Sequence, residues 1–232
     1  QVHAGKDDGI ELFGGTAGIR HAVVSQVGDD GLDWDQGWSG NAQFFIVQQD
    51  SVSDRGIEAD NLGDDNDATP RSNPTIWNLT LVGTGGAEQD GMRLRRGTAG
   101  TINNAIVTNY GASTCIRVDG TATIEQANSG DLVVSDSIVS GCGTTFELTP
   151  DDGDTTEFTG DWDALNDTAS DPLLADPANL ADPDFTPHGL SPAKEGATPG
   201  DGFDTNADFL GAVEPGCWDW TAGWTAYPAI AE

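Results

Sequence analysis

The sequence predicts an all-β solenoid, a chain that winds into stacked coils of short parallel strands. Two patterns support this fold class: a six-residue phrase occurs five times, and a second strand pattern alternates with it. In each phrase two polar residues precede a glycine or cysteine, and a strand with apolar first and third residues follows. The phrases occupy residues 7–12, 29–34, 54–59, 89–94 and 113–118. They begin 22, 25, 35 and 24 residues apart, and a period in the low twenties with two or three short strands is typical of one coil per repeat.

The second strand pattern contains a bend. Side chains alternate between the two faces of a strand, but here the first, fourth and sixth residues are suited to the interior, which predicts a bend at the third. Asn78, Asn104 and Asp136 occupy that third position, and these residue types tolerate left-handed backbone. We expect at least two parallel strands per coil and no helix of useful length, because helical periodicity is absent. The five segments are 19–24, 42–47, 76–81, 102–107 and 134–139.

Two stretches depart from the repeat. Residues 61–74 are rich in turn-forming and acidic residues and predict a loop inserted between strands. From residue 149 the repeat degrades, so we expect solenoid coils over 1–148 and an irregular capping segment over 149–232. An open solenoid exposes strand edges and an apolar interior at its ends, so the aromatic terminus is expected to form a cap; the alternative is a platform on which carbohydrate stacks. The rings are those of Trp218, Trp220, Trp224 and Tyr227.

The charge of the chain restricts its partners. The sequence has 39 acidic and 9 basic residues and a formal charge of −30, so we expect no binding to nucleic acid or to anionic membranes. Such acidity suits a protein surrounded by salt or divalent cations, or it serves solubility alone. The longest apolar stretch covers residues 44–47, so no membrane span is expected. The chain opens in the middle of a phrase, which we interpret as a trimmed product with a targeting segment and further coils upstream.

Three cysteines are too few for a disulfide scaffold and wrongly spaced for zinc. Cys115 opens one coil and Cys142 lies near the next strand, so the two either form a disulfide between neighbouring coils or remain buried thiols. A disulfide would indicate an oxidising compartment. Cys217 is left over, and we expect it to be buried in the aromatic terminus or paired outside this chain.

Several phrases resemble right-handed parallel β-helix proteins of bacterial surfaces, in the pectate-lyase-like superfamily. Asp-Pro-Leu-Leu-Ala-Asp-Pro at 171–177, Leu-Ser-Pro-Ala at 190–193 and Asp-Phe-Leu-Gly-Ala-Val-Glu-Pro at 208–215 carry the resemblance together with the coils. The phrases at 5–15 and 55–61 are similar to those of secreted β-helix proteins from marine bacteria, which implies a secreted or cell-surface protein and a chain that is their C-terminal part. The class also includes pectate lyases, polygalacturonases, adhesins and phage tailspikes, so the fold alone does not identify an activity.

Aligning the phrases places outward side chains in ladders, with neighbours about 4.8 Å apart. The early coils carry a strip of carboxylates, whereas the later coils carry arginines. One ladder reads Glu11, Asp33, Glu58, Arg93 and Arg117, and the next reads Phe13, Asp35, Asp60, Arg95 and Asp119. Before the glycines, Asp7, Asp29 and Asp54 stack beside Asp8, Asp30, Arg55 and Asp90.

The carboxylate strip predicts a calcium site. Arg55 is expected between Asp30 and Asp90, and Glu58 is expected to face Arg93, but no basic residue is placed to neutralise the remaining acids together. Calcium favours six to eight oxygen ligands in flexible geometry. The alternatives are protonated carboxyls, a solvated acidic surface, and catalytic carboxylates. The predicted calcium ligands are Asp29, Asp33, Asp35, Asp54, Glu58 and Asp60.

Two classes of function follow from these patterns. The sequence favours a non-enzymatic surface or assembly protein, a rigid calcium-tolerant rod that forms stacks or filaments through self-association or upstream coils at its N-terminal edge. The alternative is a polysaccharide lyase or glycoside hydrolase that acts on the carboxylate and arginine face. An anionic face suits an anionic glycan badly without metal, and none of the three histidines has a persuasive catalytic setting. The candidate catalytic residues are Asp33, Glu58, Arg93 and Arg117.

Overall fold

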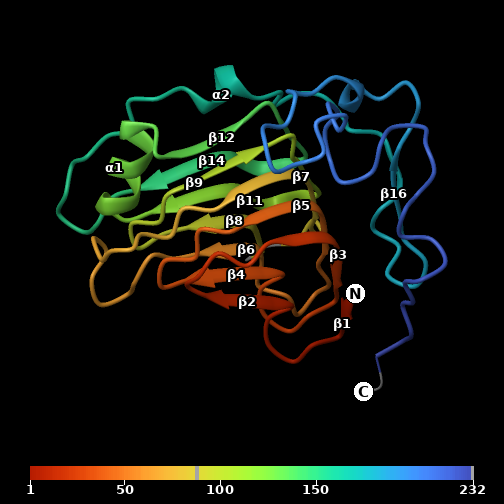
Figure 1. Cartoon of the computed structure of the whole chain (residues 1–232), viewed down its shortest axis with the longest axis horizontal. Helices are drawn as coiled ribbons and strands as arrows, with labels where there is room; N and C mark the ends of the chain where they lie inside the picture. Colours follow the sequence, from red (N-terminus) through yellow and green to blue (C-terminus); the bar gives the residue numbers. More distant parts are fainter. Residues whose placement is uncertain (87–88, 231–232) are drawn as a thin grey trace.

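The protein forms a parallel β-helix, which confirms the fold class predicted from the repeat. A computed structural model describes residues 1–86 and 89–230. Two parallel sheets stack the strands of successive coils, and Figure 1 shows this stack rising from β2 to β12 and β14. We name the two sheets the straight sheet and the bent sheet.

The first strand of each coil belongs to the straight sheet, and the second to the bent sheet. The straight sheet contains β2 (Ile10–Phe13), β4 (Leu32–Asp35), β6 (Arg55–Ala59), β8 (Asp90–Leu94), β11 (Tyr110–Asp119) and β14 (Cys142–Thr149). The bent sheet contains β1 (Val2–His3), β3 (Ile19–Ser25), β5 (Asn41–Gln48), β7 (Thr75–Val82), β9 (Gly100–Asn103), β10 (Ile106–Thr108), β12 (Leu132–Ser135) and β13 (Ile138–Val139). The other elements are α1 (Thr121–Ser129), α2 (Trp162–Leu165), the antiparallel pair β15 (Leu174–Asp176) and β16 (Asp184–Pro187), and a 3-10 helix (Pro192–Lys194).

Apolar residues of successive coils stack on one another inside the β-helix. In the straight sheet Trp34 pairs in register with Leu12 on one side and Ala59 on the other. The inward side chains of both sheets form one continuous core, in which Trp34 and Phe45 are fully buried. Each coil therefore buries its apolar face only against its neighbours, which is the energetic basis of a solenoid.

The predicted bend is present in all five coils. His21, Phe44, Asn78, Asn104 and Asp136 all have left-handed backbone, with φ between 50° and 58°. A left-handed residue reverses the alternation of side chains, so residues on both sides of the bend point into the core. In the later coils the bend interrupts the strand, and the second strand is divided into β9 and β10 or into β12 and β13.

The glycine of the repeated phrase is required by the closeness of the coils. A Cβ on Gly9 would lie 2.6 Å from the carbonyl oxygen of Gly31, and a Cβ on Gly31 would lie 2.6 Å from that of Gly56. No real side chain tolerates such an approach to a backbone oxygen, so the coils would have to separate. The repeat is therefore a packing requirement of this stack.

The C-terminal aromatic residues lie elsewhere than predicted. The C-terminal end of the core is covered by Phe158 and Trp162, whose rings are 5.4 Å apart. The later segment runs down the flank, where Trp220 and Tyr227 pack with Val213 against outward residues of the bent sheet. Figure 1 shows this segment beside the stack, and the backbone amide of Ala226 donates to Gln1 Oε1 at the N-terminus at 2.9 Å. The segment expected to form a cap therefore has two parts: a short part with Phe158 and Trp162 covers the end of the core, and a longer part packs along the bent sheet.

Asparagine and glutamine side chains at the bends hold this flanking segment. Asn78 Nδ2 donates to the carbonyl oxygens of Ala207 and Phe209, at 3.1 and 2.7 Å. Gln43 exchanges two hydrogen bonds with the backbone of Asp204. These side chains therefore satisfy backbone hydrogen-bonding groups of the flanking segment that a neighbouring strand would otherwise satisfy.

One helix was not expected from the sequence. The nine-residue α1 connects β11 to β12 and buries Ile124 and Ala127, and Gly130 ends it in left-handed backbone. Its mixed polar sequence has weak helical periodicity, so burial of one face rather than propensity selects the helix. No helix among residues 1–86 and 89–230 is long and apolar enough to cross a membrane.

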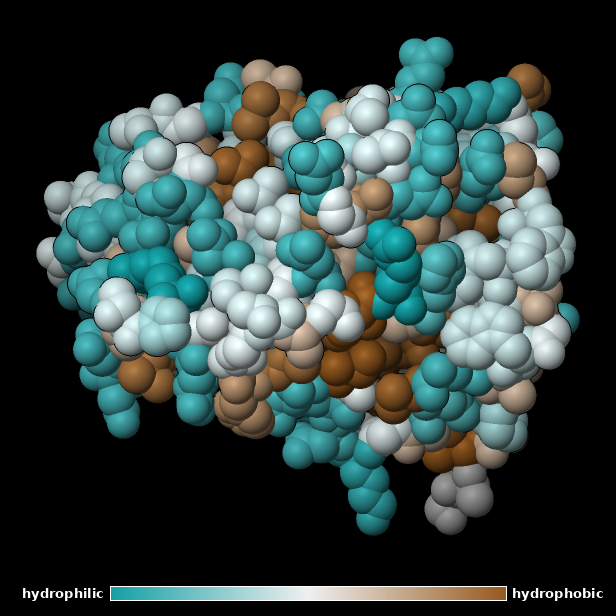
Figure 2. Space-filling model, in the orientation of Figure 1, coloured by the Kyte–Doolittle hydropathy of each residue, from teal (hydrophilic) through white to brown (hydrophobic). Residues whose placement is uncertain are grey.

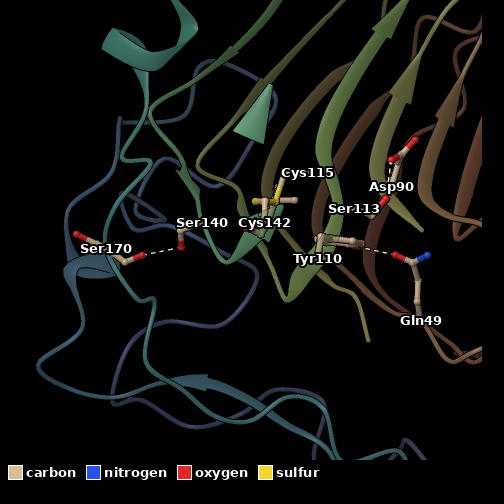
Figure 3. Close-up of a disulfide and its surroundings, with 9 residues drawn as sticks. Gln49, Asp90, Tyr110, Ser113, Cys115, Ser140, Cys142 and Ser170 are labelled. Atoms are coloured by element: carbon tan, nitrogen blue, oxygen red, sulfur yellow. Dashed lines mark hydrogen bonds between the residues drawn. A yellow bond between two sulfur atoms is a disulfide. The ribbon is translucent and has the colours of Figure 1, made fainter. Parts of the chain in front are cut away.

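Cys115 and Cys142 form a disulfide between β11 and β14, with their Cα atoms 5.6 Å apart. Figure 3 shows this bridge beside Tyr110, whose hydroxyl donates to Gln49 Oε1 at 2.6 Å inside the core. Cys217 is exposed and unpaired within the described residues, so the expectation that it would be buried in the aromatic terminus is wrong.

Candidate functional site: a carboxylate cluster on the straight sheet

Three carboxyl groups meet where the second and third coils stack. Asp30 precedes the glycine that opens β4, Asp33 lies on β4, and Glu58 lies on β6 as the register partner of Asp33. One oxygen from each of the three lies within 4.8 Å of the others. We call these three residues the carboxylate cluster.

Burial makes this cluster electrostatically unusual. Asp30 is only 3% exposed, and Oδ1 of Asp30 and Oδ1 of Asp33 have no hydrogen-bond partner among the described residues. Removal from water, followed by the charge of Glu58, raises the pKa of both Asp30 and Asp33 to about 8. Burial also raises the pKa of Glu58, although Arg95 opposes the shift. An ionised carboxylate without a partner is costly in such a site, so the cluster requires a proton or a cation.

Arginine supplies part of the missing charge. Arg55 Nη1 lies 3.9 Å from Asp30 Oδ1 and 3.5 Å from Glu58 Oε1. Arg95 pairs with Glu58 and also with Asp60, at 2.8 Å in the second contact. Neither guanidinium forms an ion pair with Asp33 within 4.0 Å in the described part of the chain.

The structure divides the six predicted calcium ligands. Asp33 and Glu58 belong to the carboxylate cluster, and Asp29 and Asp54 form an adjoining acidic group with Asp30. Asp60 lies outside these groups because Arg95 and Arg96 each pair with it at 2.8 Å.

Asp35 is also outside the acidic groups. Its Oδ1 accepts from the backbone amide of Gln36 at 2.6 Å. The sequence predicted that no basic residue neutralises Asp29, Asp33 and Asp35 together with Asp54 and Asp60. This is wrong for Asp54, which pairs with Arg55, and for Asp60, which pairs with Arg95 and Arg96. Asp60 and Arg95 are neighbours in the second ladder, whereas Arg96 reaches Asp60 from outside that ladder.

Four further acids, Asp7, Asp8, Glu11 and Asp30, were not among the predicted ligands. Asp30 completes the carboxylate cluster, while Asp8 joins Glu11 and Asp33 in one more acidic group and Asp7 and Asp29 in another. The signal of Asp8 and Asp30 is visible in the sequence, because both occupy the turn position immediately before the glycine of the repeat. The acidic groups therefore form a continuous strip from the first coil to the third.

The arginines of the later coils have other partners than expected. Arg93 pairs with Asp119 at 2.7 Å and not with Glu58, and Arg117 pairs with Asp90 and Glu147, both at 2.8 Å. A groove of about 780 Å³ lies over this region. Arg93 and Arg117 are among the described residues that line the groove, whereas Asp33 and Glu58 are not.

The four candidate catalytic residues follow one another in register on β4, β6, β8 and β11, but only Arg93 and Arg117 line the groove. The hydrogen bond to Asp90 raises the pKa of Arg117 above its usual range, which holds the guanidinium in its charged form and opposes a role as a base. The carboxylate cluster, by contrast, has the donor set of a hard cation, because carboxylate oxygens are the ligands that calcium prefers. Asp30, Asp33 and Glu58 would hold the ion, with remaining positions open to backbone oxygen or water.

Comparison with known proteins agrees with this architecture. A family model described as a pectate-lyase-like β-helix domain matches residues 1–225. No significant match was found among curated proteins or among solved structures. The match extends over both the coils and most of the flanking segment, and the stacked parallel sheets have the form that it requires. The chain belongs to the pectate-lyase-like β-helix domain family.

Proposed function

We propose that this chain is a non-enzymatic structural domain of the cell surface or extracellular space, whose first coils are stabilised by calcium. The observation that carries the proposal is the pair of buried carboxylate oxygens of Asp30 and Asp33, which lie beside Glu58 and have no hydrogen-bond partner within residues 1–86 and 89–230. Calcium at these oxygens would give each of them a ligand contact and would offset the repulsion among the three acids.

The location of the cluster suits a structural role. It joins β4 to β6, next to the first coil, where Ile10 and Leu12 are only partly buried. An ion bound across coils stabilises their stacking, and the strands of that end remain available to another β-helix or to upstream coils. The disulfide supports an oxidising environment, and extracellular fluids supply calcium.

A thermal melt tests the calcium site. At pH 8, where about half of the Asp30 and Asp33 carboxyls are ionised, calcium should raise the Tm by several degrees relative to a chelator, because an ion that binds only the folded state stabilises it. Asp33→Asn should abolish this response and should raise the Tm in chelator, since the amide removes a buried charge. Asp35→Asn is the matched control on the same strand and should keep the response. Identical melts with calcium and with chelator would refute the proposal.

The groove beside Arg93 and Arg117 supports a second candidate, cleavage of an anionic polysaccharide. Its volume of about 780 Å³ is ample for a sugar unit. Polygalacturonate incubated with the protein and calcium would then yield new chain ends that are lost in Arg117→Gln. We favour the structural role because both arginines are bound to carboxylates, which leaves no free base in the groove among the described residues.

A further inference from the structure

A separate pocket lies where the flanking segment crosses the bends of β3 and β5. It has a volume of about 240 Å³ and is lined by residues of these bends and of the segment from 204 to 220. His21 and Phe44 occupy the left-handed positions of their strands, so their rings meet the flanking segment and not the interior. This pocket lies on the bent sheet, whereas the carboxylate cluster lies on the straight sheet. We call it the flank pocket.

Aromatic rings form much of its wall. The His21 and Phe44 rings stack with centroids 4.7 Å apart, and the Trp220 ring meets His21 edge-on at 5.0 Å. Trp218 also lines the pocket and is 74% exposed. A tryptophan has a large apolar area and a polar N–H, and open aromatic surface beside a pocket is typical of an interaction site. The face drawn in Figure 2 is mostly hydrophilic, with a hydrophobic area near its centre.

Hydrogen-bonding groups surround the rings. Asp204, Asn206 and Glu214 line the pocket together with the imidazole of His21. Burial and the nearby charge of Arg20 lower the pKa of His21, so the ring is neutral at pH 7 and one nitrogen donates while the other accepts. No lysine or arginine is found among the described residues that line the pocket.

This combination suits a neutral sugar. The C–H face of a pyranose packs on aromatic faces, which carry partial negative charge, and its hydroxyl groups bond to carboxylates, amides and imidazole. A uronic acid or a sulfated sugar would instead meet two carboxylates in a chain of charge −30. The charge of the pocket therefore excludes the anionic ligands that the arginine groove would favour.

We propose that the flank pocket binds a neutral hexose unit of a glycan. This site is independent of the proposed calcium cluster, so either proposal can fail while the other stands. A rigid β-helix with such a pocket would attach to a neutral polysaccharide through its flank.

The test uses the whole chain with calcium at pH 7. Isothermal titration with hexasaccharides of glucose, galactose and mannose should show binding to at least one of them. Trp218→Ala should weaken that binding about tenfold, because a stacking surface is lost. The matched control is Phe13→Ala, which removes another exposed ring, 59% exposed, from the straight sheet; its affinity should be unchanged. Far-ultraviolet circular dichroism should show that both variants are folded.

Two further probes separate a sugar site from an ion site. Trigalacturonate should not bind at the flank pocket, and tetramethylammonium tests whether the rings and carboxylates instead form a cation cage. Glu214→Gln should change affinity for the neutral sugar by less than about threefold. The proposal is overturned if none of the three hexasaccharides binds, if only tetramethylammonium or trigalacturonate competes for Trp218, or if Trp218→Ala and Phe13→Ala weaken binding equally.

Discussion

The two ends of the straight sheet differ in how their buried carboxylates are neutralised. At the arginine end, formed by β8, β11 and β14, Asp90 and Asp119 each have an arginine partner within 3 Å. At the acid end, formed by β2, β4 and β6, Asp33 has none among the described residues, and Asp30 has only the distant Arg55. The register is continuous across both ends. The two ends therefore share one backbone arrangement, and the placement of a few arginines decides which carboxylates have a charged partner.

Arg95 joins the two ends and should give the largest effect when removed. Arg95→Gln leaves Glu58 and the deeply buried Asp60 with less compensation, and breaking a buried pair from one side costs about 4 kcal/mol. Chemical denaturation should measure this loss, and calcium should restore part of it if the ion occupies the carboxylate cluster.

The control for this change is Arg71→Gln. Arg71 pairs at 2.8 Å with Asp67, whose side chain is 78% exposed, and a solvated pair contributes less than about 1 kcal/mol. Arg71 also donates to backbone oxygens. Any loss of stability in Arg71→Gln beyond that of the ion pair would come from those hydrogen bonds. A loss of less than about 1 kcal/mol in Arg95→Gln would mean that burial at the acid end has no special energetic role.

The arginine end also has a covalent link, and its removal should rank second. The disulfide spans 27 residues, and a loop of that length contributes about 3 kcal/mol by restricting the unfolded chain. In Cys115→Ala with Cys142→Ala, hydrogen exchange should rise in β11 and β14 while β2 and β4 keep their protection. Uniform loss of protection along the stack would show that the two ends unfold as one unit.

The pH dependence should also distinguish the two ends. The folded-state pKa values of Asp30 and Asp33, about 8, lie above their unfolded values, so the folded protein binds more protons in between. Its stability in chelator should therefore fall as pH rises from about 4 to about 8. Melts at pH 5 and pH 8 should show this decline in chelator and a smaller decline in calcium. A decline that survives in Asp33→Asn with Asp30→Asn would assign it to other groups.

The sequence predicted the stack better than it predicted the side-chain partners. Apolar spacing and the bend position depend on backbone geometry that repeats in every coil, so Asn78 and Asn104 were placed correctly. The Arg95 side chain is long enough to pair with Glu58 in the other ladder. An alignment of the repeats gives only the neighbours within one ladder, so it does not predict this pair. The path of Trp220 along the flank depends on which apolar surface the irregular segment meets, namely the outer residues Val23 and Ile46. Strand periodicity marks those residues only as outward-facing.

Replacing Arg93 should cause the smallest loss of stability. This variant separates the effect of carboxylate burial from the effect of the number of ion pairs. Arg93 has one clear partner, Asp119, at 2.7 Å, so a count of arginines would rank its loss beside that of Arg95. The Asp119 side chain is 23% exposed, however, whereas that of Asp60 is 5% exposed, and water can replace a guanidinium only at the former. Arg93→Gln should therefore cost about 1 kcal/mol, and calcium should not alter the loss. A loss as large as that of Arg95→Gln would mean that the number of ion pairs, and not the depth of the carboxylate, sets the stability of this sheet.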